Sequence, residues 1–238
     1  MAVPEPVPEH HHRNVQGGAA RAAVFGVSDG LVSNVGLVLG VAGSNAAPSF
    51  VRLAGLVSLV SGAFSMAAGE YLSMAAQTEL LERELETERT EIRRNPQSER
   101  QELEAIYSSR DLDPAMAEQL ATEMMRDPEL ALEAHAREEL GIDPAQLGSP
   151  MGAAAASFFA FALGALIPLL PWFFAQGAAA TVASVVVGVM AAVAIGVALG
   201  VVTARSPLRP AVRQLVVAGA AAAVGYVLGS LMGATTPT

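Results

Sequence analysis

Residues 22–43, AAVFGVSDGLVSNVGLVLGVAG, form an apolar stretch that is long enough to span a bilayer and that contains one carboxylate, Asp29. A charged side chain at the centre of a bilayer costs about 3 kcal/mol or more, so such residues are rare and usually functional. We therefore expect Asp29 to take part in the function of the protein, with a partner elsewhere in the chain.

The composition is that of a membrane protein. Of the 238 residues, 52% are hydrophobic and only 16% are charged. Four further apolar segments reach the roughly 20 residues that a spanning helix needs, at 53–76, 151–174, 178–204 and 212–232. The sequence thus predicts an all-α, polytopic membrane protein with five transmembrane helices. The chain has no cysteine, which excludes disulfides and thiolate metal sites.

The section between the second and third segments is polar and acidic. Nineteen of the 23 acids lie between Glu79 and Asp143, within residues 77–147, which we call the insert. This charge favours cations as partners and disfavours nucleic acid. We expect the insert to be a three-helix domain that continues directly from the second membrane helix. Prolines that follow Asn or Asp predict its helix breaks at Asn95-Pro96, Asp111 to Pro114, Asp127-Pro128 and Gly141 to Pro144.

The arginines predict the orientation of the chain. They precede the first segment, recur through the insert and cluster between the fourth and fifth segments. The positive-inside rule then places residues 1–21, the insert and the last loop in the cytoplasm of a cell (inner) membrane, with the C-terminus outside. We expect residues 1–21 to be disordered, without a cleavable signal peptide, and assign no role to the run His10 to His12. Residues 22–76 and 148–238 form the membrane part.

The depth of each residue along its helix, estimated by counting residues, suggests Met66 and Glu70 as partners of Asp29. The first two segments are antiparallel neighbours, and a rise of 1.5 Å per residue puts Asp29 about 13 Å, Glu70 about 10 Å and Met66 about 16 Å from the cytoplasmic ends. Two carboxylates and a thioether suit a dehydrated divalent cation such as Fe²⁺ or Mn²⁺, and paired acids also suit protons. The alternative is that Glu70 extends to the membrane surface while Met66 fills a helix contact.

The insert carries a second set of candidate ligands. Spacings of three or four residues place Glu88 with Glu91, Glu99 with Glu102, and His135 with Glu139 on common helix faces. These pairs could converge on cations, or they could form a solvated face in which interleaved arginines neutralise the acids. The Glu-x-x-His pairs of a di-iron bundle are absent, which argues against an iron-oxidising enzyme.

Small residues recur at four-residue spacing in the last two segments, as Gly196/Gly200 and Gly225/Gly229/Gly233. Such rows permit close helix packing and sometimes dimerisation, but in segments rich in Ala and Gly they also arise by chance, so the sequence leaves an interface role open.

Several motifs together resemble one known family. The motifs FGVSDGLVSNVGLVLGVAG, SGAFSMAAGEYLSMAAQTE, RELETERTEI and EELGID are similar to those of the vacuolar iron transporter family in its bacterial form. The resemblance covers the chain from about Arg21 to Leu231. It implies a dimeric five-helix membrane domain, a cytoplasmic three-helix metal-binding domain, and export of Fe²⁺ from the cytosol in exchange for protons.

The resemblance also assigns roles to single positions. It implies that Asp29 is the acid of the transport path, that Met66 is its methionine, and that the metal-domain glutamates are Glu88, Glu91, Glu99, Glu102 and Glu139. The chain departs from the family at two places. Plant members have a glutamate where this chain has Ser58 and a glycine where it has Glu70, and a methionine pair of the metal domain is replaced by His135 and Ala136.

The leading hypothesis is therefore a homodimeric antiporter that exports Fe²⁺, with Mn²⁺ as a second candidate, in exchange for protons. The predicted metal-binding residues are Asp29, Met66, Glu70, Glu88, Glu91, Glu99, Glu102, His135 and Glu139. We expect no prosthetic group; Fe²⁺, Mn²⁺ or Zn²⁺ is the bound and transported ion. The alternative is a membrane-anchored iron-binding or sensing protein that does not transport.

Overall fold

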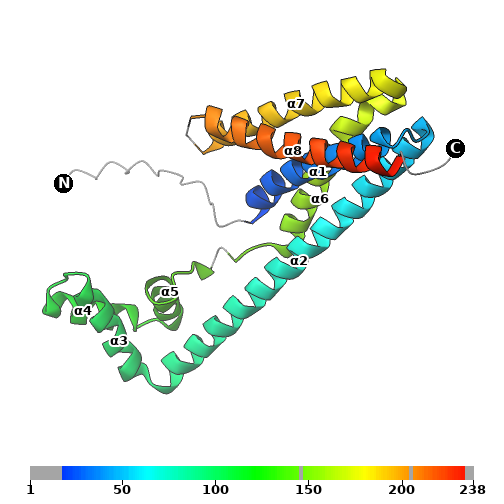
Figure 1. Cartoon of the computed structure of the whole chain (residues 1–238). Coiled ribbons are helices and arrows are strands. Elements are labelled where there is room, and N and C mark those ends of the chain that lie inside the picture. The colour runs from blue at the N-terminus through cyan, green and yellow to red at the C-terminus, as the bar shows by residue number, and fades with distance from the viewer. Residues whose placement is uncertain (1–17, 145–146, 204–205, 234–238) are drawn as a thin grey trace, which may run out of the picture.

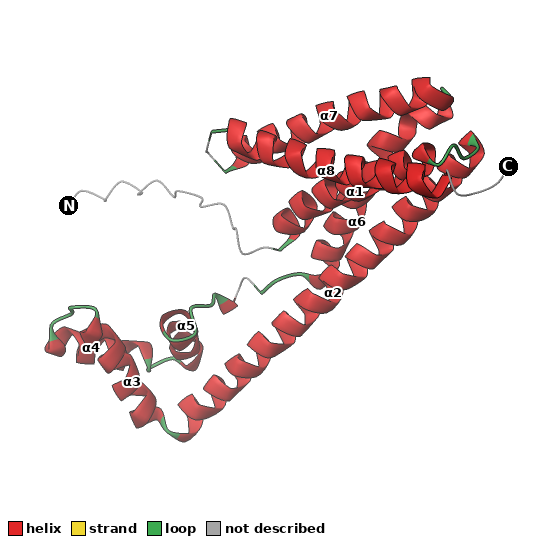
Figure 2. Cartoon of the chain, in the orientation of Figure 1, coloured by secondary structure: helices red, strands yellow, loops and turns green. Residues whose placement is uncertain are grey.

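The computed structural model describes residues 18–144, 147–203 and 206–233, which are almost entirely helical and contain no strand (Figures 1 and 2). Its elements are α1 (Ala19–Gly43), α2 (Pro48–Arg94), α3 (Pro96–Ser109), α4 (Pro114–Met124), α5 (Pro128–Glu138), α6 (Pro150–Leu169), the short 3-10 helix η2 (Leu170–Phe173), α7 (Gly177–Val202) and α8 (Leu208–Gly233). The predicted all-α class is confirmed for the described residues. The run His10 to His12 lies outside them.

Five helices are long and apolar enough to cross a membrane: α1, α2, α6 with η2, α7 and α8. They correspond to the five apolar segments of the sequence. Each is at least 18 residues long and contains an apolar window of that length, so the prediction of five spans is confirmed by length and composition. These helices pack into one bundle (Figure 1).

Helix α2 is a single helix of 47 residues, about 70 Å long at 1.5 Å per residue. It runs along the bundle and continues far beyond it to the short helices of the insert (Figure 1). The expected uninterrupted passage from the membrane segment into the insert is confirmed. The helix ends at Arg94, because Pro96 begins α3 one residue after the cap, Asn95.

Asp-Pro pairs begin the next two helices, as predicted. The carboxylate of Asp113 accepts a hydrogen bond from the backbone N–H of Ala115 at the start of α4. Asp127 accepts from the N–H groups of Glu129 and Leu130 at the start of α5. Each acid accepts hydrogen bonds from N–H groups that have no partner within the helix. The proline occupies the first helical position, where no N–H donor is needed.

Helix α1 is the centre of the bundle because glycines let two neighbours reach its backbone. On one face a Cβ at Gly30 would overlap the carbonyl oxygen of Phe161 in α6. On another face a Cβ at Gly229 of α8 would overlap the carbonyl oxygen of Gly40. Without side chains at these positions the helix backbones touch, which gives dispersion contacts that large residues would prevent.

The glycine rows of α7 and α8 are used within the chain. Gly225 and Gly229 lie against α1, as described, and Gly196 and Gly200 face the start of α8 near Ala211 and Pro207. Both rows therefore make close helix contacts within the chain.

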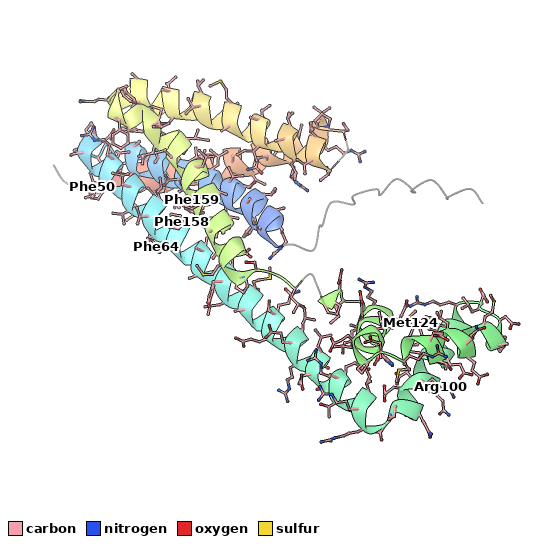
Figure 3. The ribbon with its side chains drawn as sticks, turned by 180° about the vertical axis from the view of Figure 1, so that it is seen from behind. Phe50, Phe64, Arg100, Met124, Phe158 and Phe159 are labelled. Atoms are coloured by element: carbon pink, nitrogen blue, oxygen red, sulfur yellow. The ribbon has the colours of Figure 1, made fainter. Side chains whose placement is uncertain are left out.

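Aromatic residues and buried hydrogen bonds complete the bundle around α6. The ring of Phe64 in α2 packs edge-on against Phe158 of α6, with centroids 5.2 Å apart (Figure 3). The amide of Asn34 in α1 donates to the carbonyl of Ala165, and the hydroxyl of Ser184 in α7 donates to that of Pro168. These side chains donate hydrogen bonds to carbonyls near the end of α6. A membrane interior has no water that could donate in their place.

The insert has its own apolar contacts. Leu85 and Ile92 on the extension of α2 pack with Ala131, Leu132 and Ala136 of α5. A second cluster joins α3 to α4 through Leu103, Tyr107, Ala117 and Ala121. The extension of α2 is thus one wall of the insert, which therefore consists of three short helices packed beside a long one.

The backbone contact between α1 and α8 predicts the effect of a single methyl group. Gly229→Ala should lower the free energy of unfolding by about 1–3 kcal/mol, because the added Cβ meets backbone that cannot rotate away. Gly219→Ala, on the same helix, has no atom within 4 Å of the new Cβ and should be neutral or stabilising by up to about 1 kcal/mol. Thermal unfolding of both variants in detergent tests this; equal midpoints would contradict the packing.

Candidate metal centre

Two helices bring a glutamate and a histidine together in the insert. The packing of Leu85 and Ile92 against α5 turns Glu88, which lies between them on α2, toward the same helix. From α5, His135 faces this glutamate. Glu88 is buried and the His135 side chain is completely enclosed.

The ligand atoms of three side chains lie within bonding range of one cation. Nδ1 of His135 is 3.1 Å from Oε1 of Glu88 and 3.7 Å from Oε2 of Glu139. One ligand atom from each of Glu88, His135 and Glu139 lies within 4.8 Å of the others. Two carboxylates and an imidazole are ligands that Fe²⁺, Mn²⁺ and Zn²⁺ all accept.

Several polar atoms of this cluster are buried without a hydrogen bond. Among the described residues, Oε1 of Glu88 and both ring nitrogens of His135 have no hydrogen-bond partner, although the Glu88 oxygen lies close to Nδ1. A buried polar atom left unpaired costs about 1–3 kcal/mol, so native structures rarely retain one without a role. A bound cation would satisfy such atoms, so the residues present fit a metal ion.

Three further glutamates act on this cluster electrostatically. Burial and then repulsion by Glu139, Glu99, Glu91 and Glu102 raise the pKa of Glu88 to about 7. Glu99, which is also buried, has its pKa raised by burial and by Glu102, Glu91 and Glu139. The six predicted residues of the insert thus form one electrostatic group, drawn from α2, α3 and the end of α5.

The surroundings of His135 favour the protonation state that metal binding requires. Burial lowers the pKa of His135, and the nearby carboxylates of Glu139 and Glu102 oppose that effect only in part. The lowered pKa favours the neutral imidazole over the imidazolium. A neutral imidazole has a lone pair for a metal, whereas an imidazolium has none.

The arginines of the insert divide its acids into two sets. None of the five predicted metal-domain glutamates forms an ion pair with an arginine within the described part of the chain. The acids that do pair with arginines are Glu86, Glu104, Glu118, Glu123, Glu129, Glu133, Glu138 and Asp143. The solvated-face interpretation therefore describes the second set, while the first has no counter-charge of its own.

The intramembrane candidates do not form a similar cluster within one chain. Asp29 is exposed on α1, and among the described residues its carboxylate has no hydrogen bond or ion pair; only its backbone carbonyl accepts, from Ser33. It lies seven residues beyond Ala22, which packs with Met74, and eight beyond Arg21, which pairs with Glu70. Equal rises along the antiparallel helices bring Asp29 level with about positions 62 to 67 of α2.

Met66 and Glu70 share the face of α2 that meets the bundle. Met66 packs on a cluster formed by Ala63, Phe161 and Ala165. The carboxylate of Glu70 accepts from the guanidinium of Arg21 at 3.1 Å, and its side chain is only 11% exposed. Met66 is thus at the depth of Asp29, whereas Glu70 lies one or two turns nearer the insert and has a different partner.

Arg21 is the residue that the sequence interpretation missed. The arginines before the first apolar segment served only to predict membrane orientation, yet Arg21 pairs with Glu70, which lies deeper on α2. An arginine side chain is long enough to cross from α1 to α2. The acid near the end of the second apolar segment, Glu70, could therefore have been predicted as the partner of Arg21.

Comparison with known proteins places this architecture in a family. A family model described as the VIT family matches residues 20–230. A vacuolar iron transporter of Acanthamoeba castellanii is 40% identical over 161 residues, which cover 67% of this chain and 58% of that protein. Vacuolar iron transporter 1 of Arabidopsis thaliana is 31% identical over 227 residues, covering 94% of this chain and 91% of its own length.

A relative from rice is similar to this chain over a comparable length. Vacuolar iron transporter 1 of Oryza sativa subsp. japonica is 31% identical over 221 residues, covering 91% of this chain and 88% of its own. The family match covers the insert and the five candidate membrane helices, except the first residue of α1 and the last three of α8. The chain therefore belongs to the VIT family.

Proposed function

We propose that this protein exports Fe²⁺, and secondarily Mn²⁺, from the cytoplasm in exchange for protons. The observation that carries the proposal is the set of carboxylates around buried His135 that pair with no arginine among the described residues and lie beside the extension of a membrane helix. The vacuolar iron transporters to which the chain is similar support iron as the ion. A transporter needs a metal-collecting site that is continuous with a membrane helix. A sensor that does not transport has no such need.

Glu88, His135 and Glu139 are the proposed ligands in the insert. A divalent cation between them would neutralise the repulsion that Glu91, Glu99 and Glu102 add to the cluster. The imidazole nitrogen favours Fe²⁺, Mn²⁺ or Zn²⁺ over Ca²⁺, which prefers oxygen ligands only. The insert thereby concentrates metal at the cytoplasmic side of the membrane, in the orientation that the arginines predict.

Helix α2 links this site to the membrane. Glu88 and Met66 lie on the same unbroken helix, 22 residues or about 33 Å apart. Metal released from the insert would travel along this helix toward Met66 and Asp29. Glu70, paired with Arg21, lies on the route between them. Protons returning in exchange would use the carboxylates, because one group cannot hold a metal and a proton together.

A second copy of the chain would complete the membrane site. Asp29 lies on an exposed stripe of α1 with Arg21, Phe25 and Ser33, while other faces of the helix are covered. A bare carboxylate facing lipid is unfavourable, so another protein surface is the expected neighbour. A two-fold axis near this stripe would bring two Asp29 carboxylates together, one from each protomer.

Metal binding tests the cluster in the insert. Calorimetric titration of the full chain in detergent with Mn²⁺, and with Fe²⁺ under anaerobic conditions, should show affinity lowered at least about tenfold by Glu88→Gln and by His135→Ala. Glu86→Gln is the matched control, since Glu86 lies one half-turn away on α2 and pairs with Arg89. Unchanged affinity in both ligand variants would refute the assignment.

Flux through the membrane tests Asp29. In proteoliposomes with a set pH gradient, Asp29→Asn should lower Fe²⁺ transport and the coupled proton movement by about tenfold or more, because the amide neither titrates nor balances a cation. Ser61→Ala, which removes a hydroxyl bonded only within α2, should transport normally. Wild-type flux in Asp29→Asn would exclude this site, and metal binding without any flux in the unmodified chain would favour the sensor.

Cross-linking tests the dimer. Because the chain has no cysteine, Ser33→Cys introduces a single thiol on the exposed stripe of α1. A short bis-maleimide should join two such protomers in membranes, whereas Val186→Cys, exposed on α7, should remain monomeric. Cross-linking of the α7 variant but not of the α1 variant would place the axis elsewhere.

A further inference from the structure

A cleft lies at the junction of the last two helices of the bundle. Its walls come from the end of α7 and from the residues that begin α8. It is lined by Leu199, Thr203, Ser206, Arg209, Pro210 and Arg213. It is far along the chain from the residues proposed for metal binding, and its lining carries positive charge, whereas theirs is negative.

The two arginines of the cleft have no acidic partner among the residues that the structure describes. Arg209 and Arg213 are one turn apart on α8 and both are exposed, so their guanidinium groups can act on one ligand. The chain contains no Asp or Glu after Asp143. Within the described residues, neither arginine forms an ion pair. The cleft is thus a place of uncompensated positive charge.

The cleft lies at one end of the membrane bundle. Helices α1 and α8 are parallel, since Gly36 of α1 lies against Ala221 and Gly43 lies against Tyr226. The beginning of α8 is therefore at the same end as the beginning of α1, where α2 leaves the bundle for the insert. From a cleft near the ends of two spanning helices, long arginine side chains can reach the lipid headgroups.

We propose that this cleft binds a phosphate group, with the headgroup of an anionic phospholipid as its source. Guanidinium groups bind phosphate oxygens with two parallel hydrogen bonds, and the amino end of α8 adds the favourable end of the helix dipole. Basic pockets between membrane helices bind anionic headgroups in this manner. The site does not depend on the proposed transport function.

Native mass spectrometry of the full chain in detergent tests the proposal, with phosphatidylglycerol, phosphatidylcholine and inorganic phosphate as separate probes. The wild type should retain phosphatidylglycerol, and the double variant Arg209→Gln/Arg213→Gln should bind it about thirtyfold more weakly. The control Arg93→Gln/Arg94→Gln loses the same charge at the exposed end of α2 and should bind as the wild type does.

The three probes identify the source of the phosphate. Binding of phosphatidylglycerol that phosphatidylcholine does not match, and that the double variant loses, supports the lipid headgroup. Binding of inorganic phosphate alone, also lost in the double variant, supports the phosphate site and assigns it to a soluble anion. Equal retention of every probe by wild type and double variant overturns the proposal. Thermal unfolding of both double variants, expected to match the wild type at exposed sites, verifies that they fold.

Discussion

The structure depends on the contact of α1 with two neighbours at backbone distance. Lipid tails are as apolar as leucine side chains, so helices in a membrane associate through close packing and not through exclusion of water. Gly30 and Gly164 provide that packing toward α6, and Gly40 and Gly229 provide it toward α8. With two sides of α1 committed in this way, the stripe that carries Asp29 is left uncovered, so the position of the intramembrane acid is a consequence of the packing.

The sequence predicted the elements well because each has a local cause. Apolar length defined the five spans, and prolines after Asn95, Asp113 and Asp127 defined the breaks in the insert. The lack of any break between Ala76 and Glu79 correctly indicated one continuous α2.

The side of a helix that faces each neighbour was harder to predict, because it depends on residues far apart in the sequence. Counting residues gives the depth of Asp29 and Glu70 but not the side of the helix that each occupies, and it placed both beside one site. In the structure Glu70 meets Arg21, and Asp29 faces outward. Spacing likewise identified faces in the insert, but it could not show that His135 is enclosed or which acids the arginines leave unpaired. Those facts arise from the packing of α5 on α2.

The continuity of α2 has a mechanical consequence. A helix without a sharp kink transmits a tilt along its length, so its distant end is displaced more than its middle. The bundle holds one part of this helix, and the insert is packed on the rest. A small tilt within the membrane would therefore move Glu88 through a larger arc than Met66. The cluster of Glu88 and His135 would move with it, because α5 is packed on the same part of α2.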